Sequence, residues 1–142
     1  MANGVVASRD EAFAELLHND SQYYVTHAAP TPVEAIRTIR NSGGVAVIAH
    51  PFASRRGQIL TTSTFSDLVA AGLNGIEVHH RDQNAQEQET LTGIATELNL
   101  VVTGSSDYHG TGKLNGLAEN TTHQAQWEQL ESLADARRVV KR

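Results

Sequence analysis

The chain has 142 residues, a formal net charge of −5 with neutral histidines, and no cysteine. The acidic balance argues against a protein that binds nucleic acid through bulk electrostatics, so we expect no DNA partner. The lack of cysteine excludes disulfide scaffolds and thiolate zinc sites, which leaves seven histidines and the carboxylates as metal-capable side chains. Apolar runs reach about five residues, far below the roughly 20 that span a bilayer. With no secretory signal visible, we expect a cytoplasmic protein without a membrane partner.

Helices and strands are predicted to alternate along most of the chain. Apolar residues recur at helical spacing in five segments and form three short, largely β-branched runs. The predicted helices cover residues 8–18, 31–40, 65–71, 82–98 and 122–139. The predicted strands cover residues 45–49, 76–78 and 100–103, and the first is continuously apolar, as in strands buried on both faces. The second helix has the clearest start, because Thr31 is followed by Pro32 and by Glu34 at the capping-box position.

This alternation predicts an α/β fold with a parallel sheet. A closed parallel barrel needs about eight strands and roughly 250 residues. Three strands in 142 residues cannot close such a barrel. The chain therefore corresponds to part of a larger architecture.

Each predicted strand ends beside a residue that can bind a metal ion or exchange a proton. His50 follows the first strand, His79 and His80 follow the second, and Asp107 and His109 follow the third. The carboxyl ends of parallel strands form one rim, where active sites are built. A single histidine after a strand is most often structural, but three successive strand ends favour a shared site. Imidazole together with carboxylate suits zinc, manganese or iron.

The loop after the third strand adds groups that could support such a site. Asp107 and His109 are two residues apart, so on an extended strand end their side chains point to the same side. Ser105 and Ser106 precede them and are expected to orient the aspartate or contact a substrate. A turn or capping role for Asp107 is the alternative interpretation.

Segments 45–51, 75–78 and 104–110 resemble the C-terminal motifs of the PHP family, the polymerase and histidinol phosphatase phosphoesterases. Their order and spacing are most similar to the branch of nucleoside 3′,5′-bisphosphate phosphatases and 5′-to-3′ exoribonucleases. The resemblance covers essentially the whole chain. It implies the C-terminal half of a distorted (β/α)7 barrel, with residues 1–30 ending a helical insertion and connector and residues 31–142 forming the C-terminal βα units of a single partial domain.

The resemblance also implies a site. His50 matches the histidine of an A-H-P motif, and Asp107 with His109 match the final aspartate-x-histidine pair, so these three are the implied ligands of divalent manganese, zinc or iron. Members of the family use two or three metal ions to activate water at a phosphate ester. His79 or His80 occupies a position that faces substrate. The implied substrates are small nucleotide phosphates or RNA 5′ ends.

Two arginines and one missing motif complete the comparison with that family. Arg55 and Arg56 lie just beyond the A-H-P motif and suit phosphate oxygens, although solvated loop charges are an equal alternative. The N-terminal H-x-H motif and the acidic and histidine ligands after it are absent, so the metal site is incomplete. We therefore expect a truncated or separately encoded half, inactive alone, that assembles with a complementary N-terminal half or as a homodimer. The alternatives are a non-catalytic half-barrel remnant and a phosphate-binding module.

Overall fold

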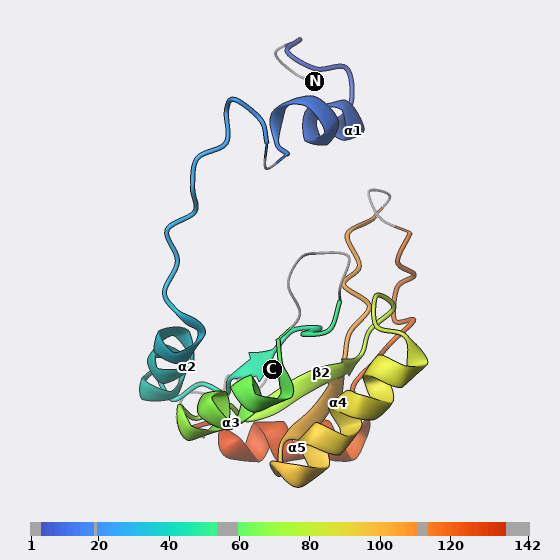
Figure 1. Ribbon diagram of the computed structural model, residues 1–142. Coiled ribbons are helices and arrows are strands. Elements are labelled where there is room, and N and C mark those ends of the chain that lie inside the picture. The colour runs from blue at the N-terminus through green and yellow to red at the C-terminus, as the bar shows by residue number, and fades with distance from the viewer. Residues whose placement is uncertain (1–3, 19, 54–59, 111–113, 136–142) are drawn as a thin grey trace.

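A three-stranded parallel sheet forms the centre of the computed structural model, which describes residues 4–18, 20–53, 60–110 and 114–135 (Figure 1). Its strands are β1 (Val47–Ile48), β2 (Gly75–His79) and β3 (Val101–Gly104), in the spatial order β1-β2-β3. Ile48 pairs with Ile76, which in turn pairs with Val102. All three carboxyl ends therefore meet at one edge. The predicted α/β architecture with a parallel sheet is confirmed.

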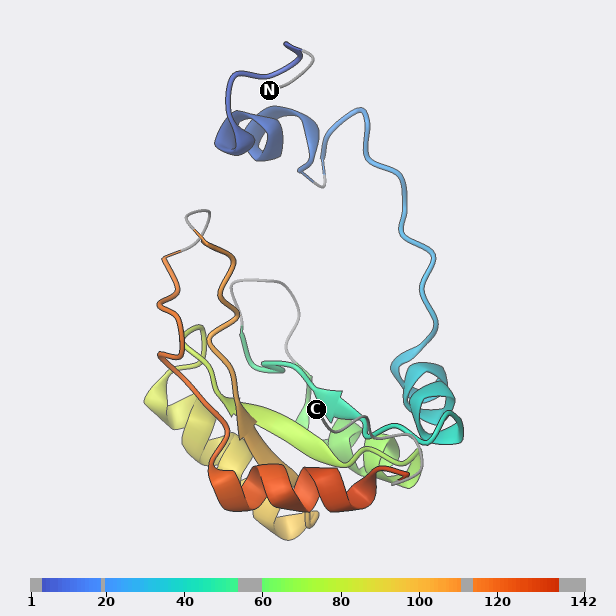
Figure 2. The same ribbon diagram turned by 180° about the vertical axis from the view of Figure 1, so that it is seen from behind.

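Helices cover both faces of this sheet. They are α2 (Pro32–Asn41), α3 (Thr62–Ala70), α4 (Ala85–Glu97) and α5 (Gln124–Leu133). Helices α3 and α4 lie on one face and α5 lies on the other, as the two opposite views show (Figures 1 and 2). In the part of the chain that the structure describes, no helix has both the length and the apolar character needed to cross a membrane.

Capping boxes set the starts of two helices. At α2, the Glu34 amide donates to Thr31 Oγ1 at 3.3 Å, and the Thr31 amide donates to Glu34 Oε2 at 2.8 Å, so the predicted box is confirmed. Helix α4 has the same arrangement between Asn84 and Glu87. Each box satisfies two backbone donors that the first helical turn leaves without partners. Because Asn84 is the cap, α4 begins at Ala85, later than the predicted start at residue 82.

The apolar core fixes the central strand. Phe65 and Leu68 from α3, Ile76 and Val78 from β2, and Leu91 from α4 are each at most 2% exposed. Full burial of such a side chain stabilises the fold by roughly 1.5–3 kcal/mol. Strand β2 is thus packed firmly between its neighbours. This packing fixes the backbone position of the residues at its carboxyl end.

The predictions for the first strand and for the end of the last helix are wrong. Strand β1 spans two residues, and Val47 is 38% exposed, because β1 lies at the edge of the described sheet and is not covered on both faces. The last helix ends at Leu133, since Ala134 has an extended backbone and the Asp135 amide donates to the Gly43 carbonyl instead. Residues beyond 135 lie outside the described part of the chain.

The N-terminal segment stands apart from the sheet. Helix α1 (Arg9–Glu11) continues as a π-helix, η1 (Ala12–Leu16), and both views show it away from the strands (Figures 1 and 2). Ser8 Oγ accepts from the Glu11 amide at 3.1 Å and caps the start of α1. Phe13 is 52% exposed, so the apolar side of this predicted amphipathic helix faces solvent rather than the core.

Candidate metal centre at the carboxyl ends of the strands

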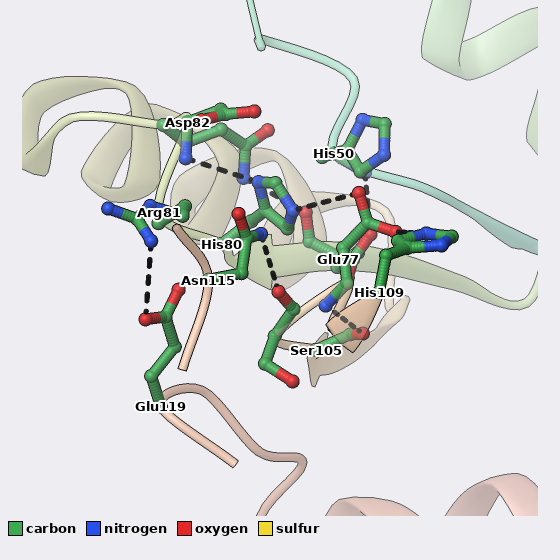
Figure 3. Close-up of polar contacts among 12 residues, drawn as sticks. His50, Glu77, His80, Arg81, Asp82, Ser105, His109, Asn115 and Glu119 are labelled. Atoms are coloured by element: carbon green, nitrogen blue, oxygen red, sulfur yellow. Dashed lines mark hydrogen bonds and ion pairs between the residues drawn. The ribbon is translucent and has the colours of Figure 1, made fainter. Parts of the chain in front are cut away.

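Three side chains from three strand ends form a compact group. His50 follows β1, His80 directly follows β2, and Asp107 follows β3; one ligand atom from each lies within 4.8 Å of the other two. In Figure 3, His50 and His109 come from the segments after β1 and β3 and lie near Glu77 of β2 and His80, the residue directly after β2. Two imidazoles and one carboxylate are a donor set that suits zinc, manganese or iron. The group therefore has the composition and the spacing of a metal site.

His80 is the most constrained member. Its side chain is completely buried, and its Nδ1 accepts a hydrogen bond from the Asp82 amide at 3.2 Å. Its Nε2 is buried with no hydrogen-bond partner and lies 4.0 Å from Asp107 Oδ2, too far for a direct bond. An unsatisfied buried polar atom costs roughly 1–3 kcal/mol. Since native proteins rarely leave such an atom unpaired, its position beside His50 and Asp107 makes the group a candidate metal site.

Burial also favours the ligand form of this imidazole. Desolvation is the largest influence on the pKa of His80 and lowers it from the usual 6.5, followed by the opposing charge of Glu77, which raises it. The positive charge of nearby His50 lowers the pKa further, and Asp82 and Asp107 raise it. The net direction is downward. Below a lowered pKa the ring becomes a cation, so at neutral pH His80 is neutral, as a metal ligand must be.

His50 reaches the group through an unusual backbone conformation. Its φ is 27°, in the left-handed region, and its ring centroid lies 4.5 Å from that of His80. Left-handed geometry costs a residue with a side chain roughly 1–2 kcal/mol. The His50 amide donates to Glu77 Oε2 at 2.9 Å. Asp107 is left-handed as well, with a φ of 48°. Strained backbone at two of three members is typical of functional sites.

The carboxylate of Asp107 lies between His80 and His109. Its Oδ2 faces His80, whereas its Oδ1 lies 2.8 Å from His109 Nε2. The His109 side chain is 54% exposed, so the structure places it on the solvent side of Asp107 and outside the compact group. Ser105 Oγ accepts from the Asp107 amide at 3.2 Å, and Ser106 contributes its carbonyl, which accepts from Asn115 Nδ2 at 2.6 Å. The two serines thus hold the loop that carries the aspartate.

The structure separates the remaining residues singled out from the sequence. His79 does not join His80: its Nδ1 lies 3.4 Å from Gln88 Oε1 on α4, because neighbouring residues on a strand point to opposite sides. Arg55 and Arg56 lie outside the described residues.

The sequence interpretation missed two charged residues at this site. Glu77 is 6% exposed within β2, and its carboxylate binds the His50 amide. Arg81 follows His80, and its Nη1 lies 3.5 Å from Glu119 Oε2 (Figure 3). The sequence could have indicated Glu77, because a charged residue between apolar residues of a strand needs a specific partner. Arg81 had only its position after His80.

Comparisons with known proteins show what this chain is similar to. No family model matches the chain. It is 40% identical over 77 residues to the phosphoribosyl 1,2-cyclic phosphate 1,2-diphosphodiesterase of Eggerthella lenta, covering 54% of this chain and 28% of that protein. It is 30% identical over 111 residues to the 3′,5′-nucleoside bisphosphate phosphatase of Chromobacterium violaceum, covering 78% of this chain and 39% of that one.

A solved structure extends these matches to the fold. A protein from Bifidobacterium adolescentis described as a metal-dependent phosphoesterase matches 94% of this chain with a TM-score of 0.84 and 36% identity. The relatives and the matched structure bear the names of phosphoesterases and phosphatases, and the chain is similar to them in sequence and fold. The chain belongs to the PHP family, as its motifs predict. It spans less than half of each of these relatives, and 47% of the matched structure.

Proposed function

We propose that His50, His80 and Asp107 bind a divalent cation and that the chain carries this part of a metal-dependent phosphoesterase site. One observation supports it above all: Nε2 of His80 is completely buried, has no partner, and faces a carboxylate and a second imidazole. The similarity to phosphoesterases points to the same chemistry. A divalent cation bound there would polarise a phosphoryl oxygen and make water more acidic.

The chain's own residues have distinct tasks in this proposal. The Asp82 amide donates to His80 Nδ1, so the proton of the neutral ring resides on Nε2. Binding through Nε2 requires that proton to move to Nδ1, and the contact with the Asp82 amide must then lengthen. His109 holds Oδ1 of Asp107, which leaves Oδ2 directed toward His80. Asp107 thereby presents one oxygen to the cation in a fixed orientation.

We further propose that this site is half of a larger centre in a (β/α)7 barrel, with manganese, zinc or iron as the cation. Three ligands hold one cation and cannot build a centre of two or three. The phosphatase relative acts on nucleoside 3′,5′-bisphosphates, and we propose the same substrate class for the assembled site, with RNA 5′ ends as the alternative. The complementary half would supply the missing histidine and acidic ligands.

Metal content and phosphate release test these proposals. The purified chain is expected to hold less than one equivalent of manganese or zinc by elemental analysis and to bind one cation when titrated. The variants His80→Leu and Asp107→Asn should abolish this binding, whereas His79→Leu should retain it. Unchanged binding in His80→Leu would refute the assignment.

Turnover needs a second measurement. The chain would be mixed with the part of the Bifidobacterium adolescentis protein that it does not match, and phosphate release from a nucleoside 3′,5′-bisphosphate would be followed with manganese. Release that requires both polypeptides and fails in Asp107→Asn supports the proposal. No release from the mixture, or tight binding of the bisphosphate without metal, would instead favour a remnant or a phosphate-binding module.

A further inference from the structure

Glu77 is a charged residue buried inside an apolar strand. It lies in β2 between Ile76 and Val78, both completely buried, and is itself only 6% exposed. A buried carboxylate destabilises a fold unless hydrogen bonds or opposite charges compensate for its lost hydration. An apolar residue would serve a strand at this position equally well. The carboxylate therefore has a purpose other than packing.

Its hydrogen-bond partner is the backbone of a proposed ligand. Glu77 Oε2 accepts from the His50 amide at 2.9 Å. This bond lies just beyond the last register pair of β1 and β2, Ile48 with Ile76. His50 has a φ of 27° and precedes Pro51, which restricts its backbone further. Such a conformation persists only where its surroundings determine it. The charge-assisted bond to Glu77 is a contact of that kind.

A second contact shows that fastening the loop alone does not need a charge. Two residues after His50, the Phe52 amide donates to Gln83 Oε1 at 3.0 Å, and Gln83 Nε2 donates to the Val78 carbonyl at 2.7 Å. Gln83 is 2% exposed, so this neutral anchor is as deeply buried as Glu77. The same loop is thus attached to β2 by an amide at one point and by a carboxylate at the other.

The Glu77 carboxylate lies close enough to the proposed metal site to attract a bound cation. Glu77 Oε2 lies 2.9 Å from the amide of His50, whose ring centroid lies 4.5 Å from that of His80, so the carboxylate is beside the proposed site. Together with Asp107, it gives the site two carboxylates, the number that balances a divalent cation. In low-dielectric surroundings this balance matters more than at the surface.

We propose that Glu77 is the positioning residue of the metal site: it holds the His50 backbone in the conformation that aims the imidazole at His80 and Asp107, and it adds the second negative charge beside the cation. This inference rests on the proposed function and goes beyond it, because Glu77 is not among the three ligand residues. Groups that orient metal ligands typically change metal affinity 10- to 100-fold when mutated.

The test separates the two tasks of Glu77. Glu77→Gln keeps an oxygen that accepts from the His50 amide and removes the charge, whereas Glu77→Ala removes both. Gln83→Leu is the matched control, since it removes the neutral anchor of the same loop. Each variant is measured by manganese titration and, in EDTA, by hydrogen exchange of the His50 and Phe52 amides.

We expect Glu77→Gln to keep the His50 amide protected while manganese affinity falls about 10-fold, and Glu77→Ala to lose protection with affinity falling up to about 100-fold. Gln83→Leu should expose the Phe52 amide and lower affinity less than Glu77→Ala. Wild-type affinity in Glu77→Gln would overturn the charge role. A protected His50 amide in Glu77→Ala would overturn the positioning role, and Glu77→Gln remains informative if Glu77→Ala does not fold.

The experiment distinguishes failure of the proposed metal site from failure of the positioning role of Glu77. Absence of manganese binding by the wild-type chain would refute the metal site and, with it, the charge role of Glu77. The exchange measurement in EDTA would still decide whether Glu77 fixes the backbone of His50.

Discussion

Replacing His80 with leucine should stabilise the metal-free chain and abolish its response to metal. The substitution removes an orphaned buried nitrogen, Nε2, whose desolvation costs roughly 1–3 kcal/mol. It also removes the acceptor of the Asp82 amide, a hydrogen bond worth about 0.5–1.5 kcal/mol in a partly buried position. The difference favours the variant by about 1 kcal/mol. For a domain near this size, that corresponds to a rise in Tm of roughly 2–4 °C.

Metal should reverse this order of stability. At a free manganese concentration 100 times the Kd, binding stabilises the wild-type fold by about 2.7 kcal/mol, and His80→Leu gains nothing. Thermal unfolding followed by circular dichroism, in EDTA and in manganese, measures both effects. His79→Leu is the matched control, since its imidazole lies toward Gln88 and the variant should keep the metal response. A His80→Leu chain that is clearly less stable in EDTA, or that metal stabilises as much as the wild type, would refute the reasoning.

Three further predictions concern the fold and its pH dependence. Gly104→Ala should destabilise the chain by about 1–3 kcal/mol in urea unfolding, because the new Cβ would lie 2.6 Å from the Thr121 carbonyl oxygen and 2.8 Å from His79 Cβ; unchanged stability would contradict this. Since the folded pKa of His80 is lowered from 6.5, the unfolded chain binds more protons near and below that pH. Stability in EDTA should therefore fall as pH decreases through 6.5, and an equally steep fall in His80→Leu would argue against His80 as the cause. Thr31→Ala should cost about 0.5–2 kcal/mol by removing the cap of α2, and a cost near zero would show that the box contributes little.

Local signals carried most of the successful predictions about the fold. The box at Thr31 and Glu34 is formed by residues three apart, so the sequence contains all that it needs. The three strands were recognised from short apolar runs, and their parallel order follows from the helices between them. The burial of β1 could not be predicted from local sequence, because it depends on which elements cover the faces of the strand. A continuous apolar run cannot show that Val47 lies at an edge of the described sheet.

The composition of the compact group could not be read from spacing. The resemblance implies His109 as a ligand because it matches the final aspartate-x-histidine pair, whereas the compact group contains His80 and Asp107 is left-handed in the structure. The pairing of β2 with β3 is also irregular between Glu77 and His79, and this local change precedes the turn that buries His80. Both features depend on backbone angles that residue types alone do not specify. What the sequence could predict was the shared edge, since parallel strands place their carboxyl ends together.

Several unfavourable features of this fold lie where the proposed ligands meet. Two left-handed residues, His50 and Asp107, lie beside the unpaired Nε2 of His80 and the buried carboxylate of Glu77. Each lowers stability by an amount comparable to the burial of one core side chain, and none is needed to hold the sheet. A cation bound between His50, His80 and Asp107 would satisfy the nitrogen and balance both carboxylates at once. The same groups that weaken the metal-free fold would then become the source of its affinity for metal.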